Sequence, residues 1–263
     1  MELGLSGKIA IVGGASKGLG RACAEGLARE GARMAICSRD PAALGRAAAN
    51  IAQETGSEVV AMPGDLTTLS NIQDLFRSTV DRFGGVDIVV CNSGGPPPGT
   101  AESADEDAWD RALQLSLLFF ARMGREAVPY MRDRGGGRII NILASTVKQP
   151  IPNLVLSAVT RLGAVGFAKT LADEVASDGI LVNNVAPGYL LTDRMMEIVE
   201  DRARVTGISD DEAMRALESN IPMGRIGRPE ELANLVVFLA SDAASYVTGT
   251  TIQVDGGVIR SML

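Results

Sequence analysis

Residues 13–20 read Gly13-Gly14-Ala15-Ser16-Lys17-Gly18-Leu19-Gly20 and follow directly after the apolar run 9–12. Glycines permit a tight turn and let the backbone approach a ligand closely. Segment 21–29, after the turn, has helical spacing, and a helix N-terminus attracts anions through its free N–H groups and its dipole. The turn therefore predicts a strand, a phosphate-binding loop and a helix in succession. A purely structural glycine turn is the alternative.

The alternation of strand and helix continues along the chain. Short apolar runs rich in β-branched residues occupy 9–12, 34–37, 59–62, 86–91, 138–142, 180–185 and 251–254. Helical spacing is found at 21–29, 41–55, 69–83, 109–132 and 229–239. Apolar strands that alternate with helices are typical of parallel sheets with right-handed crossovers. The pattern predicts an α/β fold of the Rossmann type, with about seven parallel strands in a doubly wound sheet and helices on both faces.

The chain of 263 residues suits a single domain over 1–263, because no stretch reads as a linker between two cores. Segment 193–222 departs from the alternation, since it is polar and contains several Met and Arg residues. We expect it to form a helical lid over a pocket. A surface helix pair with no gating role is the alternative.

The composition narrows the classes of function. The net charge of −7 disfavours a nucleic-acid surface, although it permits a local basic pocket. The absence of histidine excludes a His base, a His metal ligand and a Ser/His/Asp triad. Cys23, Cys37 and Cys91 are not spaced for a metal site or a disulfide framework, so we expect buried, reduced thiols and no metal. Residues 1–7 do not resemble a signal peptide, and we find no apolar stretch long enough to span a membrane. We expect a cytoplasmic protein that binds neither nucleic acid nor membranes.

Motifs in collinear order resemble the short-chain dehydrogenase/reductase family, particularly its 3-oxoacyl-ACP-reductase-like members, over nearly the whole chain. Gly14, Gly18 and Gly20 match the family's TGxxxGxG turn, with Gly13 in place of Thr. The later matches are Gly64-Asp65-Leu66, Cys91-Asn92-Ser93-Gly94, Asn183-Asn184, Pro187-Gly188, Gly227-Arg228-Pro229-Glu230-Glu231 and Val254-Asp255-Gly256-Gly257.

The resemblance implies a nicotinamide dinucleotide in a cleft that many of these residues line. Asp65 and Leu66 would flank the adenine, and Leu190 and Thr192 would hold the carboxamide end. The remaining expected contacts are Gly14, Ser16, Lys17, Gly18, Leu19, Asn92, Ser93, Gly94, Pro187 and Gly188.

The residues after the second strand favour NADP(H) over NAD(H). Ser38 stands where NAD-binding relatives carry an acidic residue for the ribose. Arg39 can stack on adenine and bind a 2′-phosphate with its planar fork, and Lys17 adds a second cation. Asp40 follows and can offset part of the Arg39 charge. Ordinary solvated surface cations are the alternative interpretation.

The resemblance places replacements at all four of the family's catalytic positions. Ser157 falls at the position of the Tyr acid and Arg161 at that of the Lys. Ala144 falls at the Ser position, with Ser145 one residue later, and Ser116 falls at the Asn position. An alkyl hydroxyl is far less acidic than a phenol, and Arg stays protonated, so neither supplies the usual acid. Arg161 can still hydrogen-bond the nicotinamide ribose.

Two other residues are candidates for the missing acid. Tyr189 follows Pro187-Gly188, which relatives place near the nicotinamide, although packing is the commoner role of such an aromatic residue. Lys148 lies in a loop that borders the family's substrate pocket, and a desolvated Lys can titrate near neutrality. A solvated loop lysine is the alternative.

Three hypotheses about function follow. The first is an NADPH-dependent oxidoreductase acting on a small carbonyl or alcohol, with Ser157, Arg161, Ser145, Lys148 and Ser116 as a non-standard catalytic set. The second is a catalytically silent NADP-binding sensor or scaffold. The third is a lyase or isomerase that retains the cofactor cleft. The resemblance also implies a homotetramer assembled through long helices such as 109–132 and through the C-terminal strand.

Overall fold

The computed structural model describes residues 2–262 and contains a seven-stranded parallel sheet. Its strands are β1 (Ile9–Gly13), β2 (Arg33–Cys37), β3 (Val59–Ala61), β4 (Ile88–Asn92), β5 (Gly137–Ile142), β6 (Ile180–Pro187) and β7 (Thr251–Val254). They lie in the order β3-β2-β1-β4-β5-β6-β7, and every neighbouring pair is parallel. The expected doubly wound α/β fold is confirmed.

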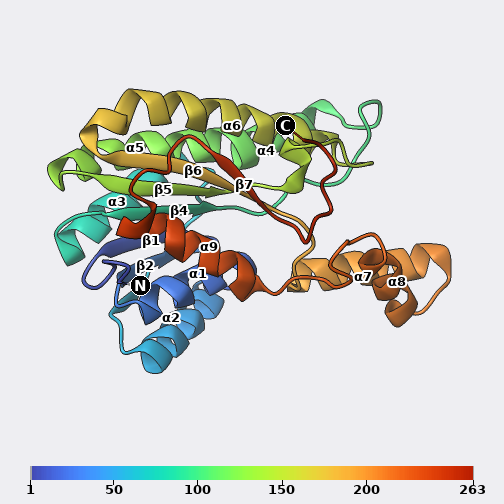
Figure 1. Cartoon of the computed structure of the whole chain (residues 1–263), viewed down its shortest axis with the longest axis horizontal. Coiled ribbons are helices and arrows are strands. Elements are labelled where there is room, and N and C mark those ends of the chain that lie inside the picture. Colours follow the sequence, from blue (N-terminus) through green and yellow to red (C-terminus); the bar gives the residue numbers. More distant parts are fainter. Residues whose placement is uncertain (1, 263) are drawn as a thin grey trace.

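Helices cover both faces of the sheet (Figure 1). One face packs against α1 (Gly18–Arg29), α2 (Pro41–Thr55) and α9 (Pro229–Ala240), and the other against α3 (Leu69–Phe83), α5 (Phe119–Asp133) and α6 (Val155–Val175). Alternate strand residues feed the two layers, because successive side chains of a strand point to opposite faces. Val12 of β1, for example, packs in the first layer, whereas Ile11 packs in the second.

The strand order reverses between β1 and β4. The chain runs outward from β1 through β2 to β3, and then returns to place β4 on the other side of β1. In open α/β sheets such a reversal leaves a crevice at the carboxyl ends of the strands, where ligands bind. The fold therefore places the glycine turn after β1 beside the residues that follow β4.

The helix expected over 109–132 is divided. It consists of α4 (Glu106–Leu113), a π-helical turn Gln114–Leu118 and α5. A single-turn bulge does not disrupt an apolar pattern enough to be visible in the sequence, and π-turns occur frequently at functional sites. This correction matters because the π-turn contains Ser116.

Helix α6 corrects the expectation about apolar stretches. Residues Val155–Asp178 are long and apolar enough to cross a membrane, judged by length and composition only. Core helices of folded domains have the same property, and α6 packs with the second layer of the core. Its charged residues Arg161 and Lys169 interrupt the apolar run, which is why the run is not conspicuous in the sequence.

The segment expected to be a lid forms two helices, α7 (Asp193–Thr206) and α8 (Asp210–Glu218), which project from one end of the domain (Figure 1). They have a small apolar cluster of their own, centred on Met195, Val199 and Leu217. The segment is therefore a distinct helical unit. Its role as a lid stays a prediction.

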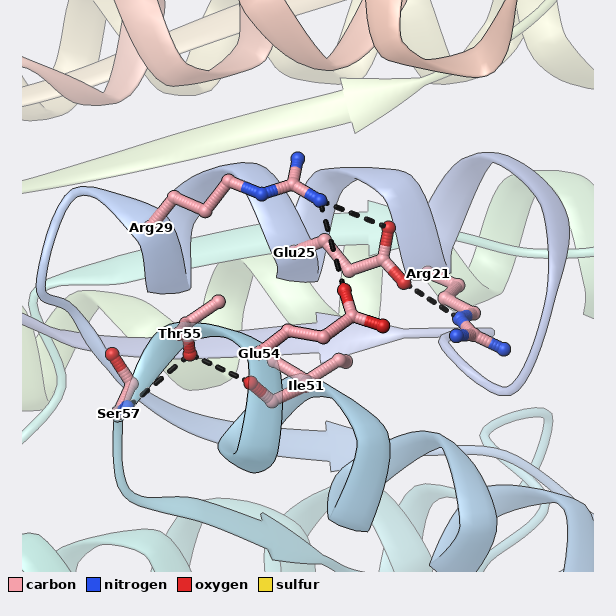
Figure 2. A network of polar contacts seen from close by, with 7 residues as sticks. All are labelled: Arg21, Glu25, Arg29, Ile51, Glu54, Thr55 and Ser57. Atoms are coloured by element: carbon pink, nitrogen blue, oxygen red, sulfur yellow. Dashed lines mark hydrogen bonds and ion pairs between the residues drawn. The ribbon is translucent and has the colours of Figure 1, made fainter.

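A polar network joins α1 to α2 on the surface of the first layer (Figure 2). Arg21 pairs with Glu25 at 2.7 Å, and Arg29 lies 3.9 Å from both Glu25 and Glu54. Glu25 is only 14% exposed, but its partners Arg21 and Arg29 reach into solvent, and ion pairs at a surface contribute little individually. The network does show how the helix that begins at the glycine turn is linked to the helix that follows Arg39.

The three cysteines are free and buried, as expected.

Candidate active site

A cleft of about 830 Å³ opens at the carboxyl ends of β1, β2, β4 and β5. Most of the residues expected to contact the cofactor line it. They are Gly14, Ser16, Lys17, Gly18, Leu19, Ser38, Arg39, Asp65, Leu66, Asn92, Ser93, Gly94, Arg161 and Thr192. Residues from widely separated parts of the chain thus meet at the reversal of strand order.

The glycine turn is shaped by backbone geometry that other residues rarely adopt. Gly14 and Gly18 both have φ of 59°, a left-handed conformation that favours glycine. Asn92 braces the turn, because its side-chain amide donates to the carbonyls of Gly13 and Gly14 at 3.3 Å. No side chain caps the N-terminus of α1. The turn and the helix end therefore form an open cradle for an anionic group.

The far end of the cleft lies after β2, where Ser38 and Arg39 line it. The Ser38 hydroxyl is buried and has no hydrogen-bond partner among residues 2–262. Asp40 accepts hydrogen bonds from the backbone N–H groups of Ala42 and Ala43 as the N-cap of α2. The Asp40 carboxylate is therefore held by the helix rather than by an ion pair with Arg39.

Lys17 and the beginning of α7 meet across the cleft. The Lys17 ammonium lies 3.2 Å from the Asp193 carboxylate, and both side chains are 68% exposed. Thr192 caps α7 by accepting from the Met195 N–H, and its side chain approaches the position of a Cβ on Gly18. The first residues of the predicted lid thus touch the phosphate-binding turn.

Arg161 lies at the floor of the cleft and is only 5% exposed. Its guanidinium donates to the carbonyls of Ile142 at 3.4 Å, of Leu143, and of Gly94 at 3.2 Å, whereas its Nε has no partner. Burial lowers the pKa of Arg161 to about 10. The side chain bridges the ends of β4 and β5 and remains a cation at neutral pH.

Ser157 precedes Arg161 by one turn of α6 and is 8% exposed. Its hydroxyl lies 3.1 Å from that of Thr146, and either oxygen can donate. The structure therefore pairs Ser157 with Thr146, and not with its neighbour Ser145, which is also buried. Ser116 is fully buried in the π-turn, and its hydroxyl has no partner.

Several expected site residues lie outside the lining of the cleft. Ser157, Ser145, Ser116, Lys148, Pro187 and Gly188 are not among its lining residues. Leu190 instead lines a separate pocket of about 90 Å³ together with Tyr189. Lys148 is partly exposed, and its carbonyl accepts from the Ser261 hydroxyl at 3.1 Å. Roles for these residues in binding or catalysis stay predictions.

Three features of the site were not predicted from the sequence. Thr146 and Arg194 were not identified, although Thr146 pairs with Ser157 and Arg194 lines the cleft. The contact of Asp193 with Lys17 was also not foreseen. The run Ser145-Thr146 offered two adjacent hydroxyls, and only the fold decides which of them faces Ser157.

The lining residues fit an NADP-type dinucleotide. The glycine cradle suits a pyrophosphate, and Arg39 and Lys17 supply cations for a further phosphate. The two buried atoms without partners on lining residues, Ser38 Oγ and Arg161 Nε, offer hydrogen bonds to ribose hydroxyls at opposite ends. Because buried polar atoms are normally satisfied, these two favour a polar ligand in the cleft.

Comparison with known proteins agrees with this geometry. A family model described as enoyl-(acyl carrier protein) reductase matches residues 14–259. The 3-oxoacyl-(acyl-carrier-protein) reductase FabG of Vibrio harveyi is 34% identical over 256 residues, covering 97% of this chain and 99% of the relative. D-beta-hydroxybutyrate dehydrogenase of Rhizobium meliloti is 33% identical over 254 residues, covering 95% of this chain and 98% of the relative.

Solved structures of reductases are also similar to this chain. L-sorbose reductase from Gluconobacter frateurii, complexed with NADPH and L-sorbose, superposes with a TM-score of 0.96 at 34% identity and full coverage of both chains. A variant of actinorhodin polyketide ketoreductase with NADPH superposes with a TM-score of 0.92 at 30% identity, covering 97% of this chain and 98% of the other.

Proposed function

The chain belongs to the short-chain dehydrogenase/reductase family, and we propose that it is an NADPH-dependent oxidoreductase acting on a small carbonyl or alcohol. The observation that carries this proposal is the cleft itself. At its β2 end, Ser38 stands in place of an acid and is followed by Arg39, and the glycine cradle lines the same cleft. The NADPH complexes of the similar reductases support the same cofactor.

Different residues along the cleft would bind different parts of the cofactor. Arg39 and Lys17 would hold the 2′-phosphate, and the N–H groups at the start of α1 would hold the pyrophosphate. Asp65 and Leu66 would flank the adenine, and Thr192 would lie toward the carboxamide, whereas Leu190 lines the smaller pocket. Arg161 fixes the ends of β4 and β5 by its bonds to Gly94 and Leu143. This arrangement would orient the reacting face of the nicotinamide ring. It does not require Arg161 to lose its proton.

The cofactor supplies hydride when it is bound. We assign the handling of the substrate oxygen to the hydroxyl pair of Ser157 and Thr146, which are 3.1 Å apart. One hydroxyl would donate its proton to the oxygen of the carbon that receives the hydride, and the pair would regain a proton from solvent. Ser145, Lys148 and Ser116 are the other members of this non-standard set. The site lacks a tyrosine phenol whose pKa is tuned toward neutrality. We therefore expect carbonyl reduction to be slower by about 10²- to 10⁴-fold than with such a positioned acid.

A catalytically silent NADP-binding sensor is the second candidate. It is favoured by the engagement of Ser157 with Thr146 and of Arg161 with backbone carbonyls, since both groups are already occupied. A cytoplasmic homotetramer completes the proposal. The exposed apolar residues Val159 and Leu162 on α6 support an interface between copies.

Turnover distinguishes the enzyme from the sensor. The chain is incubated with NADPH and a panel of small ketones, and with NADP+ and the corresponding alcohols, while absorbance of the reduced cofactor is followed. We expect slow, saturable turnover that falls in Ser157→Ala and in Thr146→Val, with Thr170→Val, an exposed threonine later on α6, as the control. Saturable NADPH binding without any turnover would support the sensor instead.

A further inference from the structure

Arg161 is a buried cation without a counter-ion. Its side chain contacts three backbone carbonyls, all of them neutral acceptors. Within residues 2–262, no carboxylate forms an ion pair with it. Buried charges are normally paired, because an unpaired charge in a poorly solvated place is costly. The floor of the cleft therefore carries one positive charge that the protein does not neutralise.

The acidic residues that line the cleft interact with groups other than Arg161. Asp40 caps α2, Asp65 accepts from Thr67, and Asp193 pairs with Lys17. Burial alone accounts for the lowered pKa of Arg161, which agrees with the absence of a nearby charge. Any ligand that reaches the floor of the cleft thus meets an uncompensated cation.

The order of the strands decides which end of a dinucleotide reaches Arg161. Ser38 and Arg39 follow β2, the glycine turn follows β1, and Arg161 bridges residues that follow β4 and β5. With the 2′-phosphate at Arg39 and the pyrophosphate on the turn, the nicotinamide lies toward Arg161. This step rests on the proposed function.

We propose that Arg161 makes the cleft discriminate between the two redox states of the cofactor, so that NADPH binds more tightly than NADP+. The oxidised nicotinamide ring carries a positive charge, whereas the reduced ring is neutral. A nearby cation in a partly desolvated site disfavours only the charged ring. At equal concentrations of the two forms, more of the protein then carries NADPH, and NADP+ dissociates more readily, while the overall equilibrium of the reaction is unchanged.

Equilibrium binding tests this proposal without turnover. Dissociation constants are measured for NADPH, for its redox-inert tetrahydro analogue, for NADP+, and for 2′-phospho-ADP-ribose, which has no nicotinamide. For the unaltered chain, NADPH and the tetrahydro analogue should bind about tenfold more tightly than NADP+, as expected for one like-charge contact in a partly solvated cleft. The ratio should fall to about one in Arg161→Met and in Arg161→Gln.

Three controls separate charge from structure. Arg161→Lys keeps the charge and should keep the preference. Arg39→Ala removes another cation from the same cleft and should weaken both redox forms equally. Affinity for 2′-phospho-ADP-ribose should change in Arg161→Met by the same factor as affinity for NADPH, because both ligands keep the ribose that Arg161 can bind and neither carries the charged ring. Circular dichroism shows whether each variant is folded.

The outcomes are distinct. NADP+ binding as tightly as NADPH to the unaltered chain would overturn the proposal, whatever the variants do. A preference that survives in a folded Arg161→Met or Arg161→Gln would also overturn it. A failure of NADPH to bind at all would defeat the proposed function on which the inference rests.

Discussion

Ser157 and Arg161 lie one turn apart on α6, and they are the central residues of the proposed non-standard catalytic set. Residues four apart lie on the same side of a helix, so both side chains turn toward the ends of β4 and β5. Ser157 is fixed by Thr146, and Arg161 by backbone carbonyls. The geometry thus retains the two positions, while the acidity of a phenol is missing.

Restoring the family's pair at these positions should create or raise ketone reduction. In the double variant Ser157→Tyr with Arg161→Lys, we expect turnover to rise by about 10²- to 10⁴-fold, because a positioned acid contributes that much. The measurement is NADPH consumption with the best ketone of the panel. Ser157→Phe with Arg161→Lys is the control, since it adds the ring without the hydroxyl. Equal rates in the two variants would contradict the assignment of position 157.

Some residues of the site could be predicted from the sequence, whereas two of its contacts could not. The cleft-lining residues from Gly14 to Arg39 were predictable, because glycine spacing and Ser38 at the place of an acid, followed by Arg39, are local signals. The pairing of Ser157 with Thr146 joins residues 11 apart across a loop. The acceptors of Arg161 are backbone carbonyls, which leave no trace in the sequence. Neither contact could be predicted without the fold.

At the scale of elements, the turn between β1 and α1 is the tightest part of the site. A Cβ on Gly20 would clash with the carbonyl of Gly14 and lie 2.7 Å from the Asn92 amide nitrogen. The glycine therefore serves the approach of α1 to the turn, and not only the ligand.

Replacing this glycine should damage both stability and binding. We expect Gly20→Ala to lower the free energy of unfolding by about 1–3 kcal/mol through overpacking, and to abolish tight NADPH binding. Gly45→Ala is the matched control, because a Cβ there meets nothing within 4 Å inside helix α2. It should raise stability by about 0.5–1 kcal/mol. Urea denaturation checks both values, and an unaffected Gly20→Ala would show that the turn is not tightly packed.

The ion pair between the turn and α7 gives a second prediction for an element. In the proposed binding mode Asp193 competes with the cofactor for Lys17, so Asp193→Asn should raise NADPH affinity by up to about fivefold at low salt. The gain should shrink at high salt because exposed charges are screened. Asp201→Asn on the same helix is the control, since Asp201 pairs with Arg204 and neither residue lines the cleft. Weaker NADPH binding in Asp193→Asn would show that the pair assists the cofactor instead.

The elements differ in how visible they were in the sequence. Strand 251–254 and helices 41–55 and 69–83 have the expected limits, because caps and β-branched runs mark them clearly. Asp40, Gly56 and Gly84 supply such signals at the helix ends. Helix α6 lacked a clear polar face, and the π-turn at Ser116 changes the pattern only locally. Both needed the tertiary structure to be recognised.

At the scale of the whole molecule, α6 presents apolar residues on both of its sides. Its inner side packs in the core, while Val159 and Leu162 on the outer side are 52% and 55% exposed. Exposed apolar residues side by side on a helix are typical of an interface. The proposed tetramer would cover them.

A charge at this surface should therefore change the assembly. We expect a tetramer for the unaltered chain and a smaller species for Leu162→Glu, measured by size-exclusion chromatography with light scattering. Val205→Glu on α7 is the control, because Val205 is 78% exposed and lies away from α6. An unaltered chain that elutes as a monomer would refute the proposed assembly.

Every role assigned to the cleft depends on the identity of its ligand, and a titration with NADPH and NADH followed by cofactor fluorescence tests that identity. We predict saturable binding of NADPH, weaker binding of NADH, and a loss of NADPH affinity of about 10- to 100-fold in Arg39→Ala with NADH unaffected, because a charged hydrogen bond is lost. No saturable NADPH binding, or equal affinity for the two cofactors, would contradict the assignment of the cleft to NADP(H).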